Sequence, residues 1–150
     1  MNVVIRPLSP ADHTAWLSLW QGYLDFYERA LAPEITDLTW TRLHDLAEPM
    51  FALAAERDGR LVGFAHAILH RSTWLAGHSC YLEDLFVSPG DRRGGVGGAL
   101  IEAVAQQARD RGCDRLHWLT HTDNATARRL YDKLAAHLGF VSYRRSLLDP

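Results

Sequence analysis

Cysteine and long hydrophobic runs are scarce in this 150-residue sequence, and each scarcity excludes a class of protein. The two cysteines, Cys80 and Cys113, cannot form a disulfide framework and lack the spacing of metal ligands. No apolar run approaches the roughly 20 residues that span a bilayer, and the first residues lack the pattern of a secretory signal. A formal charge of -2 argues against a nucleic-acid partner, since such proteins carry a basic excess. We therefore expect a cytoplasmic protein with no metal site, no membrane contact and no nucleic-acid ligand.

Length and composition fit a single globular domain that covers residues 1–150. Hydrophobic residues make up 47% and charged residues 23% of the chain, as in ordinary folded proteins. Acidic residues predominate over 12–48, and basic residues, nearly all arginine, are denser over 92–145. This asymmetry suits a cationic substrate and an anionic cofactor. It also fits two solvated helix faces of unequal charge, so both interpretations stay open.

Hydrophobic periodicity and turn residues predict the element order β-α-α-β-β-β-α-β-α-β. The predicted strands are 3–5, 51–55, 61–69, 81–87, 116–120 and 140–143. The predicted helices are about 10–29, 39–47, 95–111 and 124–137. Strands that run together in the middle of the chain and then alternate with helices indicate a mixed α/β fold, a sheet flanked by about four helices.

A glycine-dense loop between a strand and a long amphipathic helix, at 87–100, is the most informative segment. Glycines let a backbone approach a ligand closely, and a helix start offers unpaired N–H groups and a positive dipole end. This combination binds phosphate or pyrophosphate, and Arg92 and Arg93 would add charge-assisted contacts. The structural alternative is that the glycines allow tight packing of the helix on the sheet.

Two of the three possible cofactors of this loop are disfavoured by its sequence. A nucleoside-triphosphate loop ends in Gly-Lys-Ser/Thr, and neither Lys nor Ser/Thr follows these glycines. A dinucleotide loop needs Gly-x-Gly-x-x-Gly after the first strand, whereas Leu100 occupies the last position here, after several strands. Coenzyme A is the third possibility.

The spacing Arg92-x-x-Gly95-x-Gly97 resembles the Arg/Gln-x-x-Gly-x-Gly/Ala signature of the GNAT N-acetyltransferase superfamily. Immediately upstream, Tyr81-Leu82-Glu83-Asp84-Leu85-Phe86-Val87 resembles the acyl-binding strand of the diamine (spermidine/spermine) branch. Downstream, 118–131 and 139–145 resemble the second half of the cofactor site. The C-terminal pattern also resembles a branch that acetylates lysine side chains of proteins. The resemblance extends from about residue 61 to residue 145.

The resemblance implies a mostly antiparallel central sheet of six or seven strands that splay at the cofactor site. It implies acetyl-CoA as acetyl donor, coenzyme A as product, and a homodimer. The expected reaction is direct attack of a primary amine, either a small polyamine-like molecule or a lysine side chain, on the acetyl group. The alternative is a non-catalytic coenzyme A-binding sensor or interaction module with the same fold.

The resemblance also implies roles for individual residues. Glu83 is expected to deprotonate the amine through ordered water, which matters because an alkylammonium has a pKa near 10.4. Tyr131 is expected to protonate the departing thiolate. The residues expected to contact coenzyme A are Leu85, Phe86, Val87, Arg92, Arg93, Gly94, Gly95, Val96, Gly97, Gly98 and Asn124. Strand alternation predicts that Glu83 shares a face with Tyr81 and Leu85, with Asp84 on the other face; a structural carboxylate at a strand bulge is the alternative for Glu83.

The acceptor is harder to infer. The candidates for contact with the amine substrate are Tyr27, Glu28, Trp74 and Asp84, since aromatic faces and carboxylates hold cations. Thr73 stands where the diamine branch carries an acid, so the prediction stops at a primary amine. His66 and His70 are expected to share one strand face, but no carboxylate completes a metal set there.

Overall fold

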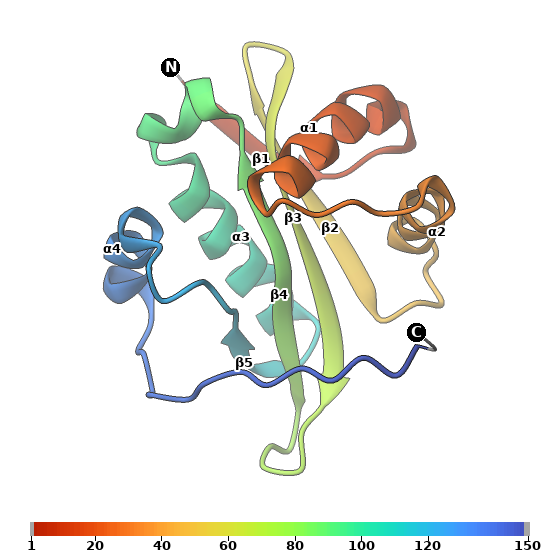
Figure 1. Ribbon diagram of the computed structural model, residues 1–150. Helices are drawn as coiled ribbons and strands as arrows, with labels where there is room; N and C mark the ends of the chain where they lie inside the picture. Colours follow the sequence, from red (N-terminus) through yellow and green to blue (C-terminus); the bar gives the residue numbers. More distant parts are fainter. Residues whose placement is uncertain (1, 149–150) are drawn as a thin grey trace. The chain divides into compact units, whose positions relative to one another are not determined.

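The computed structural model describes residues 2–148 (Figure 1). The elements in order are β1 (Val3–Pro7), the 3-10 helix η1 (Pro10–Asp12), α1 (His13–Phe26), α2 (Pro33–Leu43), β2 (Met50–Arg57), β3 (Arg60–Arg71), β4 (His78–Val87), the 3-10 helix η2 (Pro89–Gly94), α3 (Val96–Asp110), β5 (Cys113–His117) and α4 (Ala125–Leu134). The chain divides into two compact units, one ending at Leu119 and the other beginning at Thr120. Within residues 2–148, no helix combines the length and apolar character that crossing a bilayer requires.

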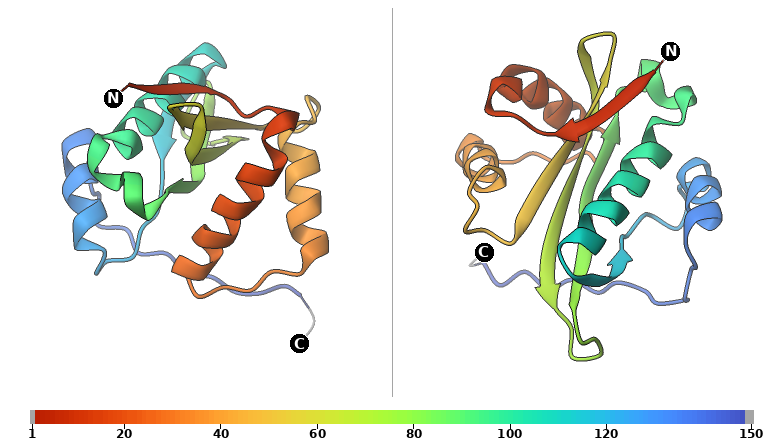
Figure 2. Two further views of the ribbon diagram at one scale, coloured as in Figure 1. Left: turned by 90° about the horizontal axis from the view of Figure 1, so that it is seen from above. Right: turned by 180° about the vertical axis from the view of Figure 1, so that it is seen from behind.

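The first unit contains one five-stranded sheet in the order β1-β2-β3-β4-β5. The pairs from β1 to β4 are antiparallel, and β5 runs parallel to β4. Helices α1 and α2 cover one face of this sheet and α3 covers the other, as Figure 2 shows. The predicted mixed, mostly antiparallel sheet flanked by helices is therefore confirmed, whereas the predicted count of six or seven strands is wrong for the described residues.

The missing strand is the one predicted at 140–143. Residues 136–148 form neither helix nor strand. β-Branched and aromatic residues favour a strand only where a neighbouring strand pairs with their backbone N–H and C=O groups, so propensity alone does not create one.

Two boundaries also differ from the prediction. Strand β5 ends at His117, before most of its predicted range. Helix α2 begins at Pro33, where proline at the first helical position suits a helix start.

Aromatic side chains fix α1 on the sheet. Trp16, Trp20 and Leu24 recur every four residues along α1 and are buried. Their cluster includes Phe64 of β3 and Phe86 of β4, the two strands that carry the candidate site. Burial of each such side chain contributes about 1.5–3 kcal/mol. The position of α1 over β3 and β4 is thus set by packing along its whole length.

The middle of β4 contains a β-bulge. Its register with β3 pairs Asp84 with His66 and then Leu82 with Ala67, so that it passes over Glu83, which is the inserted residue. An inserted residue interrupts the alternation of side chains between the two faces of a strand.

The bulge reverses the predicted faces of the candidate residues. Phe86 packs in the α1 cluster, and Asp84, two residues before it, lies on the same face. Leu85 therefore points to the α3 face. The prediction that Leu85 shares the face of Tyr81, with Asp84 opposite, is wrong because the extra residue shifts the alternation by one. The predicted face of Glu83 stays a prediction, since the inserted residue has no partner in the register.

A buried ion pair holds η2, the segment that opens the glycine loop. Nη1 of Arg57 donates to Oδ1 of Asp91 at 2.8 Å, and Nη1 of Arg60 donates to Oδ2 at 3.3 Å. The Arg57 and Asp91 side chains are only 10% and 9% exposed. The Arg57 guanidinium also lies against Gly94, where it leaves no room for a Cβ. Burial opposes ionisation of Asp91, but the hydrogen bonds from Arg60 and Arg57 outweigh it and lower the pKa of this carboxyl.

We expect Asp91→Asn to lower the Tm at pH 7, because Arg57 then stays buried without its carboxylate. Since the pKa of Asp91 is lowered in the folded state, its contribution to the free energy of unfolding is complete above its ordinary value of 3.8. That contribution is lost as the pH falls through the lowered value. Thermal unfolding between pH 7 and pH 3 should show a gap between wild type and variant that narrows on acidification. The exposed Asp37→Asn is the control, and a gap of constant size would contradict the assignment.

Candidate functional site

Strands β4 and β5 diverge beside the glycine loop. Their parallel pairing ends at Tyr81 and His117, where β5 stops, whereas β4 continues to Val87. The N–H of Ser88 donates to a carbonyl of β3 at 2.8 Å, so by alternation Leu85 and Val87 direct their backbone groups away from β3. This half of β4 therefore offers backbone N–H groups along an edge that β5 does not cover, and the predicted splay is present.

The N-terminus of α3 provides a second set of backbone donors. Gly95 is its N-cap and has φ 74°, a left-handed conformation that costs glycine little. No side chain caps this end of the 15-residue helix, so its first-turn N–H groups and positive dipole end can receive an anion. The predicted phosphate contacts, Gly94, Gly95, Val96, Gly97 and Gly98, all lie here. The Val96 side chain is fully buried, so only its backbone can contact a ligand.

The Arg92 side chain contacts other residues of the first unit. Its Nε donates to the Val87 carbonyl at 2.9 Å, and its guanidinium lies 5.5 Å from the ring centre of Phe26 and 5.4 Å from that of Phe86. The side chain thus links the end of α1 to the end of β4. Arg93 is exposed at the end of η2. Direct phosphate contact by either arginine stays a prediction.

Asn124 and Tyr131 lie in the second unit. Oδ1 of Asn124 accepts from the N–H of Ala127 at 3.4 Å, and Nδ2 donates to Oγ1 of Thr120 at 3.3 Å, so Asn124 caps α4. Tyr131 lies two turns further along the same helix. The convergence of these two residues with the glycine loop and Glu83 of the first unit stays a prediction.

The predicted acceptor contacts are not all brought together. Tyr27 ends α1 and is half-buried, and burial together with the Asp84 carboxylate raises the pKa of its phenol. Glu28 follows as an exposed residue with φ 53°. Trp74 is 81% exposed in the hairpin between β3 and β4, at the end of β4 opposite η2 (Figure 1). The structure therefore associates Tyr27 with Asp84 and leaves Trp74 apart from them.

A hydrogen-bonded cluster that the sequence analysis missed surrounds Asp84. Nε1 of Trp16 on α1 donates to Nε2 of His66 on β3 at 3.0 Å. Nδ1 of His66 lies 2.9 Å from Oδ2 of Asp84 on β4. Burial, the Asp84 charge and a hydrogen bond to Asp84 raise the pKa of Tyr23 on α1. These four residues, Trp16, Tyr23, His66 and Asp84, form what we term the Asp84 cluster. No local motif predicts it, because Trp16 lies 50 residues before His66.

His70 also has a partner that strand alternation did not predict. Its Nε2 lies 3.2 Å from Nε2 of His117, so that it joins β3 to β5. Burial lowers the pKa of His117, and the neighbouring His70 and Arg115 lower it further. Among residues 2–148, no three His, Cys, Asp or Glu side chains gather as a metal site.

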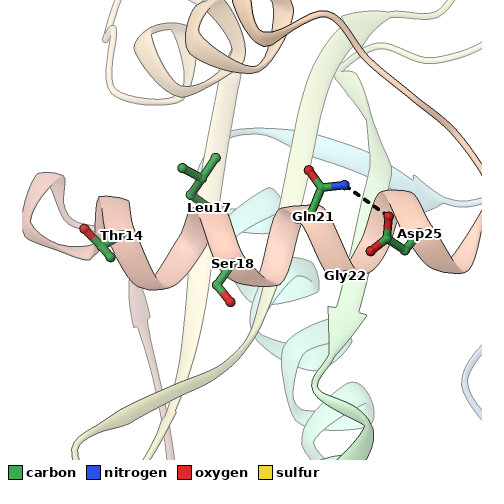
Figure 3. Close-up of a pocket in the computed structure, with 6 residues that line it drawn as sticks. All are labelled: Thr14, Leu17, Ser18, Gln21, Gly22 and Asp25. Carbon is green, nitrogen blue, oxygen red and sulfur yellow. Dashed lines mark hydrogen bonds between the residues drawn. The ribbon is translucent and has the colours of Figure 1, made fainter.

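A shallow hollow on α1 lies outside these groups. Figure 3 shows that one helix supplies its whole lining, which consists of Thr14, Leu17, Ser18, Gln21, Gly22 and Asp25. Nε2 of Gln21 donates to Oδ1 of Asp25 at 3.1 Å across it. None of the predicted site residues lines the hollow, so we assign it no part in the reaction.

Comparison with known proteins agrees with this arrangement. A model of the acetyltransferase (GNAT) family matches residues 15–136. The chain is 34% identical to the D-amino-acid N-acetyltransferase HPA3 of Saccharomyces cerevisiae, over 97% of this chain and 91% of that protein. It is 35% identical to the thialysine N-epsilon-acetyltransferase of Bos taurus, over 62% of this chain and 55% of that protein. A ribosomal-protein-alanine N-acetyltransferase structure from Brucella melitensis biovar Abortus 2308 superposes with a TM-score of 0.81 at 25% identity, covering 97% of this chain and all of that one.

These relatives transfer acetyl groups to amines, and their family uses acetyl-CoA as the donor. The comparisons therefore favour an acetyl-transfer enzyme over the non-catalytic coenzyme A-binding module. The chain belongs to the GNAT acetyltransferase family.

Proposed function

We propose that this protein transfers the acetyl group of acetyl-CoA to a primary amine, and that residues 1–150 form one catalytic domain. The observation that carries the proposal is the edge of β4 that β5 leaves open, next to the uncapped glycine start of α3. The family match spans both compact units, which supports a single functional domain.

The donor site is built mainly from backbone. N–H groups from Gly94 to Gly98 would hold the pyrophosphate, and the outward N–H groups of Leu85 and Val87 would hold the acetyl and pantetheine arm. Phe86 would act only by placing Leu85 and Val87, because its ring packs among the aromatic residues under α1 and its backbone groups face β3. Arg93 would add charge, Arg92 would keep the end of β4 in place, and Asn124 would contact the cofactor from α4. When bound, acetyl-CoA supplies the activated thioester.

Two side chains would move protons during the reaction. Glu83 projects from the bulge as an exposed carboxylate and would accept a proton from the ammonium group through water. The amine nitrogen then bonds to the acetyl carbon as the carbon–sulfur bond breaks. The hydroxyl of Tyr131 would give its proton to the departing sulfur, and the second proton, which the nitrogen loses as the amide forms, would restore that hydroxyl. This division leaves Asp84, on the α1 face, for binding the amine.

The acceptor that we propose is a small molecule with a primary amine. The two relatives are named for D-amino acids and thialysine, both of which carry an amine. The largely buried carboxylate of Asp84 beside Tyr27 suits an ammonium group. Contacts of Glu28 and Trp74 with the acceptor are part of the proposal, and a lysine side chain of a protein is the other acceptor of the same chemistry.

We also propose that the enzyme works as a cytoplasmic homodimer. The family resemblance supports the dimer. Two free thiols, Cys80 and Cys113, are compatible with a reducing compartment.

Acetyl-CoA and coenzyme A should each raise the Tm, whereas ATP at the same concentration should not. A ligand at 100 times its Kd stabilises the folded state by about 2.7 kcal/mol. Differential scanning fluorimetry with the three ligands checks this. The absence of a shift at millimolar acetyl-CoA would overturn the donor site, and an equal shift with ATP would indicate a general nucleotide site.

Glu83→Gln should reduce kcat/KM for the amine at pH 7 by about 10²–10⁴-fold, the range for loss of a general base. The loss should shrink as the pH approaches the amine pKa near 10.4, because free amine becomes abundant. Steady-state rates between pH 6 and pH 10 give the profile. Glu34→Gln, on the exposed start of α2, is the control. A loss independent of pH would argue for a structural carboxylate.

Tyr131→Phe should lower kcat about 10²-fold or more with little change in the KM for the amine, since the lost proton donor acts only on the departing sulfur. Single-turnover measurements establish whether chemistry limits the rate. Glu102→Gln, at an exposed position of α3 with no assigned role, is the control. Unchanged turnover across pH, with chemistry limiting, would remove Tyr131 from the mechanism.

A further inference from the structure

The Asp84 cluster defines the proton positions on His66. An indole N–H can only donate, so Nε2 of His66 accepts from Trp16 at 3.0 Å. The proton of the neutral imidazole must then be on Nδ1, which donates to Oδ2 of Asp84 at 2.9 Å. His66 is thus a neutral ring in one tautomer, with its single N–H directed at the carboxylate.

The packing around His66 holds its ring in this orientation. The ring is 2% exposed, with the Phe64 ring stacked at 4.5 Å and the Trp20 ring at 5.4 Å between centres. Its neighbour on β2 is Ala52, which carries no charge. The titratable groups that face the cluster are Asp84 itself, Tyr23, Tyr27, Glu83 and His13. Burial and the Asp84 charge raise the pKa values of Tyr23 and Tyr27, and the Glu83 charge raises that of Tyr23 further. The His13 ring centre lies 6.4 Å from that of Trp16. A second proton on His66 would place Nε2–H against the indole N–H, so His66 serves as a donor and not as a base.

Asp84 retains capacity for a ligand. Its carboxylate receives the His66 N–H and a hydrogen bond with Tyr23, and an ionised carboxylate has about four acceptor directions. Its side chain is 13% exposed, enough for contact with a small group from solvent. Tyr23 and Tyr27 stand beside it with ring centres 5.0 Å apart. A carboxylate next to two aromatic rings is a recognition site for an ammonium group.

We propose that His66 is a positioning residue for the acceptor: with its tautomer fixed by Trp16, it holds the Asp84 carboxylate in place to bind the ammonium group of the substrate. The inference rests on the proposed acetyl transfer and adds to it a residue that no motif identified. Asp84 touches the amine, and His66 acts through Asp84.

Two substitutions separate this role from simple packing. The amide N–H of Asn reaches about the position of Nδ1, so His66→Asn keeps the donor to Asp84 and loses the acceptor for Trp16. The amide of Gln reaches about the position of Nε2, so His66→Gln keeps the acceptor for Trp16 and loses the donor. Both variants remove most of the buried ring, so their losses of Tm should be similar.

Kinetics with thialysine, spermidine and D-phenylalanine as acceptor probes then give the test. We expect His66→Gln to raise the KM for an accepted amine about tenfold or more, the size of a lost hydrogen bond to a charged group, with the KM for acetyl-CoA little changed. His66→Asn should recover most of this loss. Equal losses in the two variants, or losses that follow Tm, would overturn the positioning role.

A spectroscopic measurement covers variants that fail to fold. Long-range proton–nitrogen NMR of the wild type should show His66 as the Nδ1–H tautomer, with Nε2 unprotonated. Spermidine should shift this signal, and Asp84→Asn should abolish the shift. An Nε2–H tautomer, a charged ring at pH 7 or no response to spermidine would overturn the inference.

The same measurements distinguish the two proposals. A wild type that acetylates none of the three probes, yet shows the spermidine-dependent His66 signal, would overturn the proposed reaction and leave the ammonium site supported. A wild type that acetylates an amine normally, without the expected His66 tautomer, would overturn the positioning role alone.

Discussion

One inserted residue in β4 determines which groups can meet an amine substrate. Because the register passes over Glu83, Asp84 joins Phe86 on the face covered by α1 and lies opposite His66. In a regular strand Asp84 would instead face α3, among the buried side chains of that helix. The bulge also leaves Glu83 exposed, so that two adjacent carboxylates occupy different environments. One can therefore act on protons through water while the other is held by hydrogen bonds.

The donor side depends on backbone instead. The divergence of β5 from β4 uncovers N–H groups, and the left-handed Gly95 starts α3 without a side-chain cap. This arrangement requires that η2 keep its place, which the buried pair of Arg57 and Asp91 ensures. Burial of the Arg57–Asp91 ion pair desolvates two charges, and the hydrogen bonds that Asp91 receives from Arg57 and Arg60 offset this unfavourable free energy. The ion pair therefore acts on the loop that would hold the cofactor, without being part of the site.

Sequence reasoning recovered what depends on local pattern. Helix periodicity, turn residues and the glycine spacing predicted the element order as far as α4 and the start of α3, and the family resemblance implied the splay. Sequence reasoning failed where a structural feature depends on a residue or strand that is distant in the sequence. The run at 140–143 has strand propensity, which is insufficient without a neighbouring strand. The bulge at Glu83 depends on the register with β3, which a single strand does not encode. The partners Trp16 and His66 are 50 residues apart, so no local spacing could associate them.

A buried imidazole beside a carboxylate is usually taken as an ion pair, and the indole of Trp16 argues against that here. Because the Trp16 indole donates to Nε2 of His66, Nε2 carries no proton of its own. The His66–Asp84 contact is therefore a neutral N–H bonded to a charged carboxylate. The site therefore keeps a net negative charge, which an ion pair would have neutralised. In the proposed function, a cationic substrate would then meet an uncompensated charge in a partly buried environment, where Coulomb attraction exceeds that in bulk water. In the proposed site, Trp16 would thereby help to set the charge that the amine encounters.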